Sequence, residues 1–176
     1  MMGDATIVAG GFIYPDSASL GSLDDSVKEM SGSPARREMQ RFVKEISKLD
    51  LHRWEELHTE TLDLSPKFVP YVGHVVWGEN YRRGAFMADL QREFALAGVD
   101  RLGELPDHLE PVLRYLDTTD HPLPDLVDVL PGAVTTMIKD LKKEDRKNPY
   151  LYLLGAAQAV LGERVQEAAA ARRANT

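Results

Sequence analysis

Apolar residues recur along most of this chain at the three- and four-residue spacing that places them on one face of a helix. Segment 35–46 follows this pattern, with charged residues on the opposite face. Its apolar face consists of Met39, Phe42, Val43 and Ile46. Ser33 is a good N-cap residue, and Pro34 suits the first turn of a helix. The pattern therefore predicts a helix over this segment.

Five further segments show the same period, and helices are expected at 51–64, 79–97, 109–116, 126–143 and 150–171. Asp50 and Asp107 are suited to cap the first and third of these helices at their N-termini. Gly98 stands where a C-terminal glycine cap belongs. Pro131 predicts a break within the fourth helix, because a proline in a helix interior removes a backbone hydrogen bond.

Segment 68–77, with the sequence FVPYVGHVVW, is the stretch whose composition favours a strand. No second segment has the alternation of a partner strand, and a lone strand has nothing to pair with. We therefore expect a loop that enters a short buried helix. Residues 1–176 are together expected to form one all-α domain, a single compact helical bundle of about seven or eight helices, with a tail that frays from about residue 170.

Composition narrows the class of partner. The 176 residues are 43% hydrophobic, enough for a packed core, and the net charge is −7. Nucleic acid and anionic lipid both bind Lys and Arg, so an acidic chain suits neither. No apolar run approaches the roughly 20 residues of a membrane helix, and Met1–Pro15 lacks the basic start of a signal peptide. We expect a cytoplasmic protein that does not insert into membranes.

The residue types that enzymes use for catalysis do not occur in this chain at the spacings typical of catalytic sites. The chain has no cysteine, no GxSxG sequence and no phosphate-binding glycine loop. The histidines are His52, His58, His74, His108 and His121. None lies three or four residues from another, so no helix face aims two of them at one metal. His58, beside Glu55 and Glu56, has the composition of an ordinary helix surface.

The serines near the N-terminus are explained as helix caps and loop residues rather than nucleophiles. They are Ser17, Ser19, Ser22, Ser31 and Ser33. Adjacent carboxylates such as Asp24-Asp25 point apart on a helix and indicate a solvated face. We therefore expect no catalytic residue, no bound metal and no cofactor, in a protein that is not an enzyme.

The densest collection of aromatic, charged and glycine residues lies in segment 71–116. Gly78 allows a sharp turn after the apolar run. The charged turn that follows contains Glu79, Arg82 and Arg83. Tyr71 and Trp77 are amphipathic side chains of the kind enriched at interfaces. At the start of the next helix, the His108 imidazole can cover the first turn.

At these residues the chain resembles the assembly chaperones of respiratory molybdenum enzymes. It is most similar to the nitrate reductase delta subunit and more distantly to the trimethylamine-N-oxide reductase chaperone. The resembling motifs are, in order, Tyr14-Pro15-Asp16, Leu62-Asp63-Leu64, Gly78-Glu79, Arg83-Gly84, Ala97-Gly98, Leu105-Pro106-Asp107-His108-Leu109 and Tyr115-Leu116. The similarity covers residues 6–116, and the C-terminal third matches only in its helical character.

The resemblance implies an all-α cytoplasmic protein whose partner is another protein. Such chaperones bind the N-terminal tail, often a twin-arginine signal or its remnant, of a molybdopterin-containing catalytic subunit and hold that subunit ready for cofactor insertion. An acidic surface suits a basic tail, which can bind as a helix in a groove. The client-binding residues expected from this are Tyr71, His74, Trp77, Glu79, Arg82, Arg83, Asp107, His108 and Arg114.

Two positions depart from the family pattern. Where the family often has a second histidine soon after His74, this chain has the apolar run 75–77, and Arg114 stands where the family often has an acidic residue. Both departures lie in the region expected to contact the client, so they bear on which oxidoreductase the client is. Its substrate can be nitrate, selenate, chlorate, perchlorate, dimethyl sulfide or ethylbenzene. Two other hypotheses stay open: a helical metal-dependent hydrolase with ligands distant in sequence, and a helical adaptor unrelated to molybdenum enzymes.

Overall fold

The computed structural model describes residues 2–176, which fold into nine α-helices and one π-helical turn without any strand. The elements are α1 (Asp4–Gly10), α2 (Ser19–Glu29), α3 (Pro34–Ile46), α4 (Leu51–His58), η1 (Thr59–Asp63), α5 (Val72–Trp77), α6 (Tyr81–Ala97), α7 (Leu109–Leu116), α8 (Pro124–Glu144) and α9 (Tyr150–Ala174). Eight of the helices have seven residues or more. The expected all-α class is confirmed.

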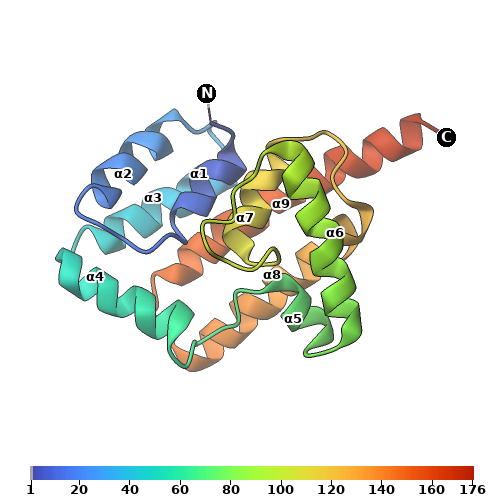
Figure 1. The fold of residues 1–176 in the computed structure, drawn as a ribbon. Coiled ribbons are helices and arrows are strands. Elements are labelled where there is room, and N and C mark those ends of the chain that lie inside the picture. The colour runs from blue at the N-terminus through green and yellow to red at the C-terminus, as the bar shows by residue number, and fades with distance from the viewer. Residues whose placement is uncertain (1) are drawn as a thin grey trace.

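Helix α9 organises the bundle. It lies against α3 and α8 and also contacts α1, and its last turns project beyond the body of the molecule (Figure 1). Leu153 and Leu154 are fully buried, and Ala156 and Ala157 let neighbouring helices approach closely. Burying each leucine contributes about 1.5–3 kcal/mol, so α9 supplies much of the core that holds the other helices in place.

The predicted helix caps are confirmed at three positions. Ser33 Oγ accepts the Arg36 N–H at 3.4 Å, and Asp50 Oδ1 accepts the Arg53 N–H at 2.9 Å. Gly98 ends α6 with a φ of 71°, the left-handed conformation that a glycine adopts without strain. The apolar face predicted for α3 is buried as well.

The structure corrects two predictions about the helices: the break expected at Pro131 is absent, and one helix was not expected. Helix α8 begins at Pro124 and continues without interruption through Pro131. The neighbouring Leu130 and Val134 are buried, and their burial outweighs the cost of about 3 kcal/mol for the interior proline. The pattern also gave no sign of α2, where Ser19 and Ser22 are helical rather than loop residues. That helix is mostly polar and buries little beyond one apolar pair.

Segment 68–77 is a loop followed by the short helix α5, as expected. Its strand propensity is used only at one antiparallel bridge, between Tyr71 and His108. The Val72 N–H donates to the Asp107 carbonyl at 2.8 Å, and the Leu109 N–H donates to the Pro70 carbonyl at 2.9 Å. This bridge fixes the start of α5 beside the start of α7.

None of the helices in residues 2–176 combines the length and the apolarity that crossing a membrane requires.

Candidate functional site

The Asp107 carboxylate is the centre of the predicted region and is fully buried. Arg83 donates to it twice, from Nε at 2.9 Å and from Nη2 at 3.3 Å. The Gly73 N–H donates to Oδ2 at 3.1 Å. A buried carboxylate is costly unless it is paired and hydrogen-bonded, and here both conditions are met. Asp107 therefore ties α5, α6 and the start of α7 together.

His108, not Asp107, is the N-cap of α7, so the predicted cap was wrong by one residue. The Glu110 N–H donates to His108 Nδ1 at 3.1 Å. An accepting Nδ1 requires the neutral tautomer with its proton on Nε2. Burial lowers the pKa of His108, and the carboxylates of Glu104 and Asp107 oppose that shift. The imidazole does cover the helix start, as predicted.

Tyr71 lies against both of these groups and is half-buried. Its hydroxyl donates to Glu104 Oε2 at 3.1 Å, and its ring meets the His108 ring edge-on at 5.2 Å. The Arg83 guanidinium lies over the same ring, 5.6 Å from its centre. Burial and the Glu104 carboxylate raise the pKa of Tyr71 to about 12. The five side chains of Tyr71, Arg83, Glu104, Asp107 and His108 form what we name the Asp107 cluster.

Gly73 is a structural requirement of this cluster that the sequence pattern did not single out. A β-carbon at this position would lie 2.8 Å from Asp107 Oδ2 and 3.0 Å from Arg83 Cγ. Both distances are too short for a side chain to fit without displacing the ion pair. A lone glycine in the first turn of a short helix was the only signal in the sequence.

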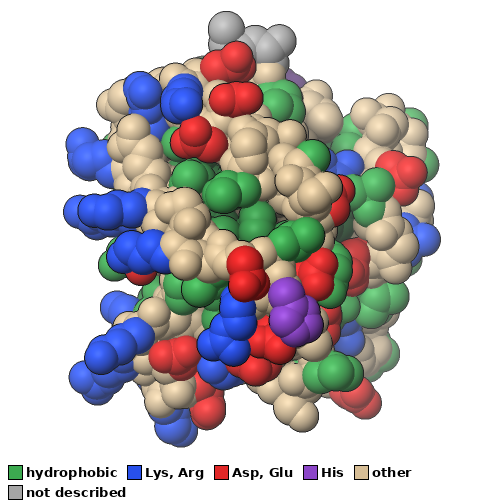
Figure 2. Space-filling model, turned by 90° about the vertical axis from the view of Figure 1, so that its left-hand side faces the viewer, with side chains coloured by type: hydrophobic (Ala, Val, Ile, Leu, Met, Phe, Trp, Pro, Cys, Tyr) green, Lys and Arg blue, Asp and Glu red, His purple; other side chains and the backbone are tan. Residues whose placement is uncertain are grey.

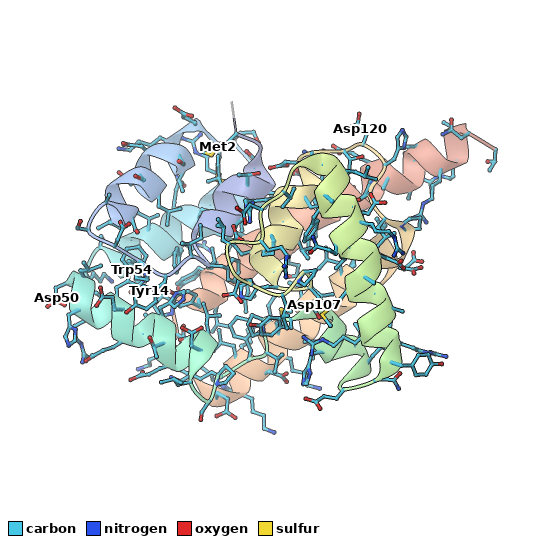
Figure 3. The ribbon with its side chains drawn as sticks, in the orientation of Figure 1. Met2, Tyr14, Asp50, Trp54, Asp107 and Asp120 are labelled. Atoms are coloured by element: carbon cyan, nitrogen blue, oxygen red, sulfur yellow. The ribbon has the colours of Figure 1, made fainter. Side chains whose placement is uncertain are left out.

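A second polar group lies beside the cluster, around His58. Contrary to the prediction of an ordinary helix surface, His58 is buried. Its Nδ1 is 3.1 Å from the Tyr150 hydroxyl, which also accepts the Trp54 indole N–H at 3.2 Å. The exposed Tyr14 ring packs edge-on against the imidazole at 5.3 Å. Figure 3 shows Trp54 on α4 with Tyr14 next to it, and Asp107 near α5.

Two carboxylates, Asp63 and Glu104, affect the pKa of both His58 and His108. Burial lowers the pKa of His58 as it does that of His108, and Asp63 and Glu104 oppose the shift at each histidine. Neither Asp63 nor Glu104 has a Lys or Arg partner within ion-pair distance among residues 2–176. Asp63 and Glu104 therefore place negative charge near both histidines.

The remaining predicted residues do not join the cluster. His74 and Trp77 lie on α5, where the Trp77 ring packs against Phe86 at 5.2 Å. Glu79 and Arg82 are exposed beside the start of α6. Of the nine residues predicted to bind a client, only Tyr71, Arg83, Asp107 and His108 are in mutual contact.

Arg114 has a structural arrangement of its own. It donates to the buried Glu110 carboxylate from Nε at 2.5 Å and from Nη2 at 3.0 Å, and it also bonds to the Asp100 carbonyl. These bonds fasten the loop after α6 to the side of α7. Arg114 is thus engaged within the fold.

Among residues 2–176, no group of three or more His, Asp or Glu side chains is arranged to hold a metal ion. No protein-family model matches this chain, and no curated protein matches it in sequence.

Proposed function

We propose that this protein is a system-specific chaperone rather than an enzyme. In this proposal it binds the N-terminal tail of the catalytic subunit of a nitrate-reductase-like molybdenum oxidoreductase in the cytoplasm and assists cofactor insertion and assembly. The order of motifs along residues 14–116 supports the class of client. The binding site is proposed from Asp63 and Glu104. These two carboxylates lack a cationic partner among residues 2–176, and they lie beside the aromatic groups around His58 and His108.

A basic client residue suits these groups. Asp63 and Glu104 attract a guanidinium by charge, and an arginine can stack on an aromatic ring while its N–H groups bond to a carboxylate. The Tyr71 ring already holds one guanidinium, that of Arg83, on a face. The exposed Tyr14 ring, which covers His58, offers a second aromatic surface.

Apolar side chains stand beside the same carboxylates. Leu64 is 75% exposed and follows Asp63 directly, and Leu105 is 44% exposed and follows Glu104 directly. Exposed apolar groups next to acidic ones fit a segment in which basic residues are followed by apolar ones. A twin-arginine signal or its remnant has this character, so the proposed ligand is such a tail.

The test is titration of the purified protein with a peptide copied from the N-terminus of a molybdopterin oxidoreductase encoded in the same genome. Asp63→Asn with Glu104→Gln keeps hydrogen-bond acceptors and removes two negative charges. We expect affinity to fall about tenfold or more, since interfacial charge pairs couple by about 1.5 kcal/mol or more. Asp25→Asn with Glu29→Gln, which makes the same charge change on the exposed face of α2, is the control and should bind like the unaltered protein.

Three outcomes would contradict the proposal. One is the absence of binding heat together with unchanged client activity on co-expression. Another is a stoichiometric transition metal in the purified protein, which would favour a metal-dependent hydrolase. The third is a gene neighbourhood without a molybdopterin oxidoreductase, which would favour an unrelated helical adaptor.

A further inference from the structure

A groove lies between α3, α8 and α9, away from the Asp107 cluster, and its volume is about 520 Å³. Pro34 and Glu38 of α3 form one wall, and Ile138 and Lys142 of α8 form the other. The floor belongs to α9. Nothing in the proposed client site uses these residues, so the groove needs an explanation of its own.

The cations at this groove are free of ion pairs. Lys142, Arg146 and Lys147 line it where α8 turns into α9, and none has a carboxylate within 4.0 Å among residues 2–176. Many exposed cations elsewhere are paired, as Lys28 is with Asp24 at 3.0 Å and Lys48 with Glu45 at 2.8 Å. Among residues 2–176, five of the eleven Lys and Arg residues without an ion pair fall within segment 139–147.

Negative charge in the groove is small. Glu38 is the one carboxylate among its lining residues, and it already pairs with Arg41 at 2.9 Å. Segment 139–147 as a whole holds five Lys and Arg against three Asp and Glu, in a chain whose net charge is −7. Figure 2 shows Lys and Arg side chains along the left edge of the face that it draws, with Asp and Glu scattered over the rest of that face.

The floor of the groove includes one large apolar residue and two small ones. Leu151, Gly155 and Ala159 follow one another at four-residue spacing along α9, so they lie on one face of that helix. They span about 12 Å at 1.5 Å per residue, which is roughly two turns of a helix. Gly155 and Ala159 are small, and the Glu38 side chain lies over Gly155, where a β-carbon would be 3.0 Å from Glu38 Oε2. A simple inorganic anion would need the cations but would make no use of this floor.

We propose that this groove binds an acidic amphipathic helix of a partner protein. Leu or similar side chains of that helix would occupy the floor along α9, and its carboxylates would pair with Lys142, Arg146 and Lys147. Charge complementarity argues for an acidic partner, and the two-turn apolar floor argues for a helix. This surface is independent of the client site, so the protein would hold two segments of opposite charge on separate surfaces.

The probe is a fluorescent synthetic helical peptide of about 15 residues, with Leu along one face and Glu on the adjoining face. Binding is measured by fluorescence anisotropy. Lys142→Glu, Arg146→Glu and Lys147→Glu together should weaken binding about tenfold or more, and added salt should weaken binding to the unaltered protein. Lys28→Glu, Arg92→Glu and Arg173→Glu together make the same charge change on exposed residues outside the groove and should leave binding nearly intact.

A second variant tests the groove without changing charge. Ala159→Phe fills the floor and should weaken binding of the peptide while circular dichroism shows an unchanged helical melt. Equal binding to the Ala159→Phe variant, or equal losses in both charge variants, would overturn the proposal. So would full displacement of the peptide by ATP or inorganic phosphate, since the groove would then be an anion site, or concentration-dependent dimerisation that the groove substitutions abolish.

Discussion

Gly73 shows how one absent side chain permits a buried ion pair. The Asp107 carboxylate needs donors on both oxygens, and one of them is the Gly73 backbone N–H itself. The β-carbon of any other residue would occupy the space of the carboxylate and of Phe86, whose Cδ2 would lie 3.2 Å away. The absence of a side chain at Gly73 is therefore needed for the ion pair that lies beside the proposed binding surface.

We predict that Gly73→Ala lowers the free energy of unfolding by about 1–3 kcal/mol, the usual cost of overpacking a core. Urea denaturation measures this change. Gly84→Ala in α6 is the matched control, because a β-carbon there meets no heavy atom within 4 Å. That variant should be neutral or more stable by up to about 1 kcal/mol, as alanine favours helices over glycine. Equal stability of the two variants would show that the crowding at Gly73 is relieved without cost.

At the scale of helices and loops, local features were predictable from sequence and non-local ones were not. Ser33, Asp50 and Gly98 act within a turn of their own helix, and each was identified correctly. Asp107 looked like a cap because Asp is a good cap, yet its carboxylate is bound by Arg83, 24 residues earlier. With that acceptor engaged, the cap of α7 falls to His108. A residue's distant partners thus decide its role.

The cap of α7 is expected to make stability depend on pH. Burial lowers the pKa of His108 below its ordinary value of 6.5, so the unfolded chain binds a proton more readily than the folded one. The stabilisation is complete above pH 6.5 and is lost as pH falls through the lower folded pKa. Protonated Nδ1 would also turn a donor toward the Glu110 N–H.

The measurement is the free energy of unfolding between pH 7.5 and about pH 5, compared with a variant that cannot titrate. His108→Asn keeps a side-chain acceptor suited to an N-cap and should reduce the fall in stability with acid. His58 also has a lowered pKa, so part of the fall should remain. His121→Asn, at an exposed loop position, should show the same pH dependence as the unaltered protein. If His108→Asn also kept the pH dependence of the unaltered protein, His108 would not be the source of the loss of stability in acid.

Across the whole molecule, contacts between residues far apart in sequence set the arrangement that hydrophobic periodicity left open. His58 meets Tyr150 across 92 positions, and Thr6 meets Asp117 across 111. Periodicity predicts which face of a helix is buried, but it does not say against which other helix. The all-α class could therefore be derived from sequence, whereas the burial of His58 and the groove on α9 could not.

Asp117 forms hydrogen bonds with both the first and the last helix of the fold. Its carboxylate accepts the Thr6 N–H and hydroxyl, both at 2.7 Å, and Arg164 Nη2 at 2.8 Å, so it links α1 and α9 at the end of α7. Asp117→Asn should cost about 1.5–3 kcal/mol, because hydrogen bonds to a charged group are lost. Asp120→Asn, an exposed change in the following loop, is the control. Hydrogen exchange should show faster exchange of the α1 amides in Asp117→Asn alone, since Thr6 lies in the first turn of α1. Unchanged α1 protection with lowered global stability would instead mean that Asp117 acts mainly through Arg164 and α9.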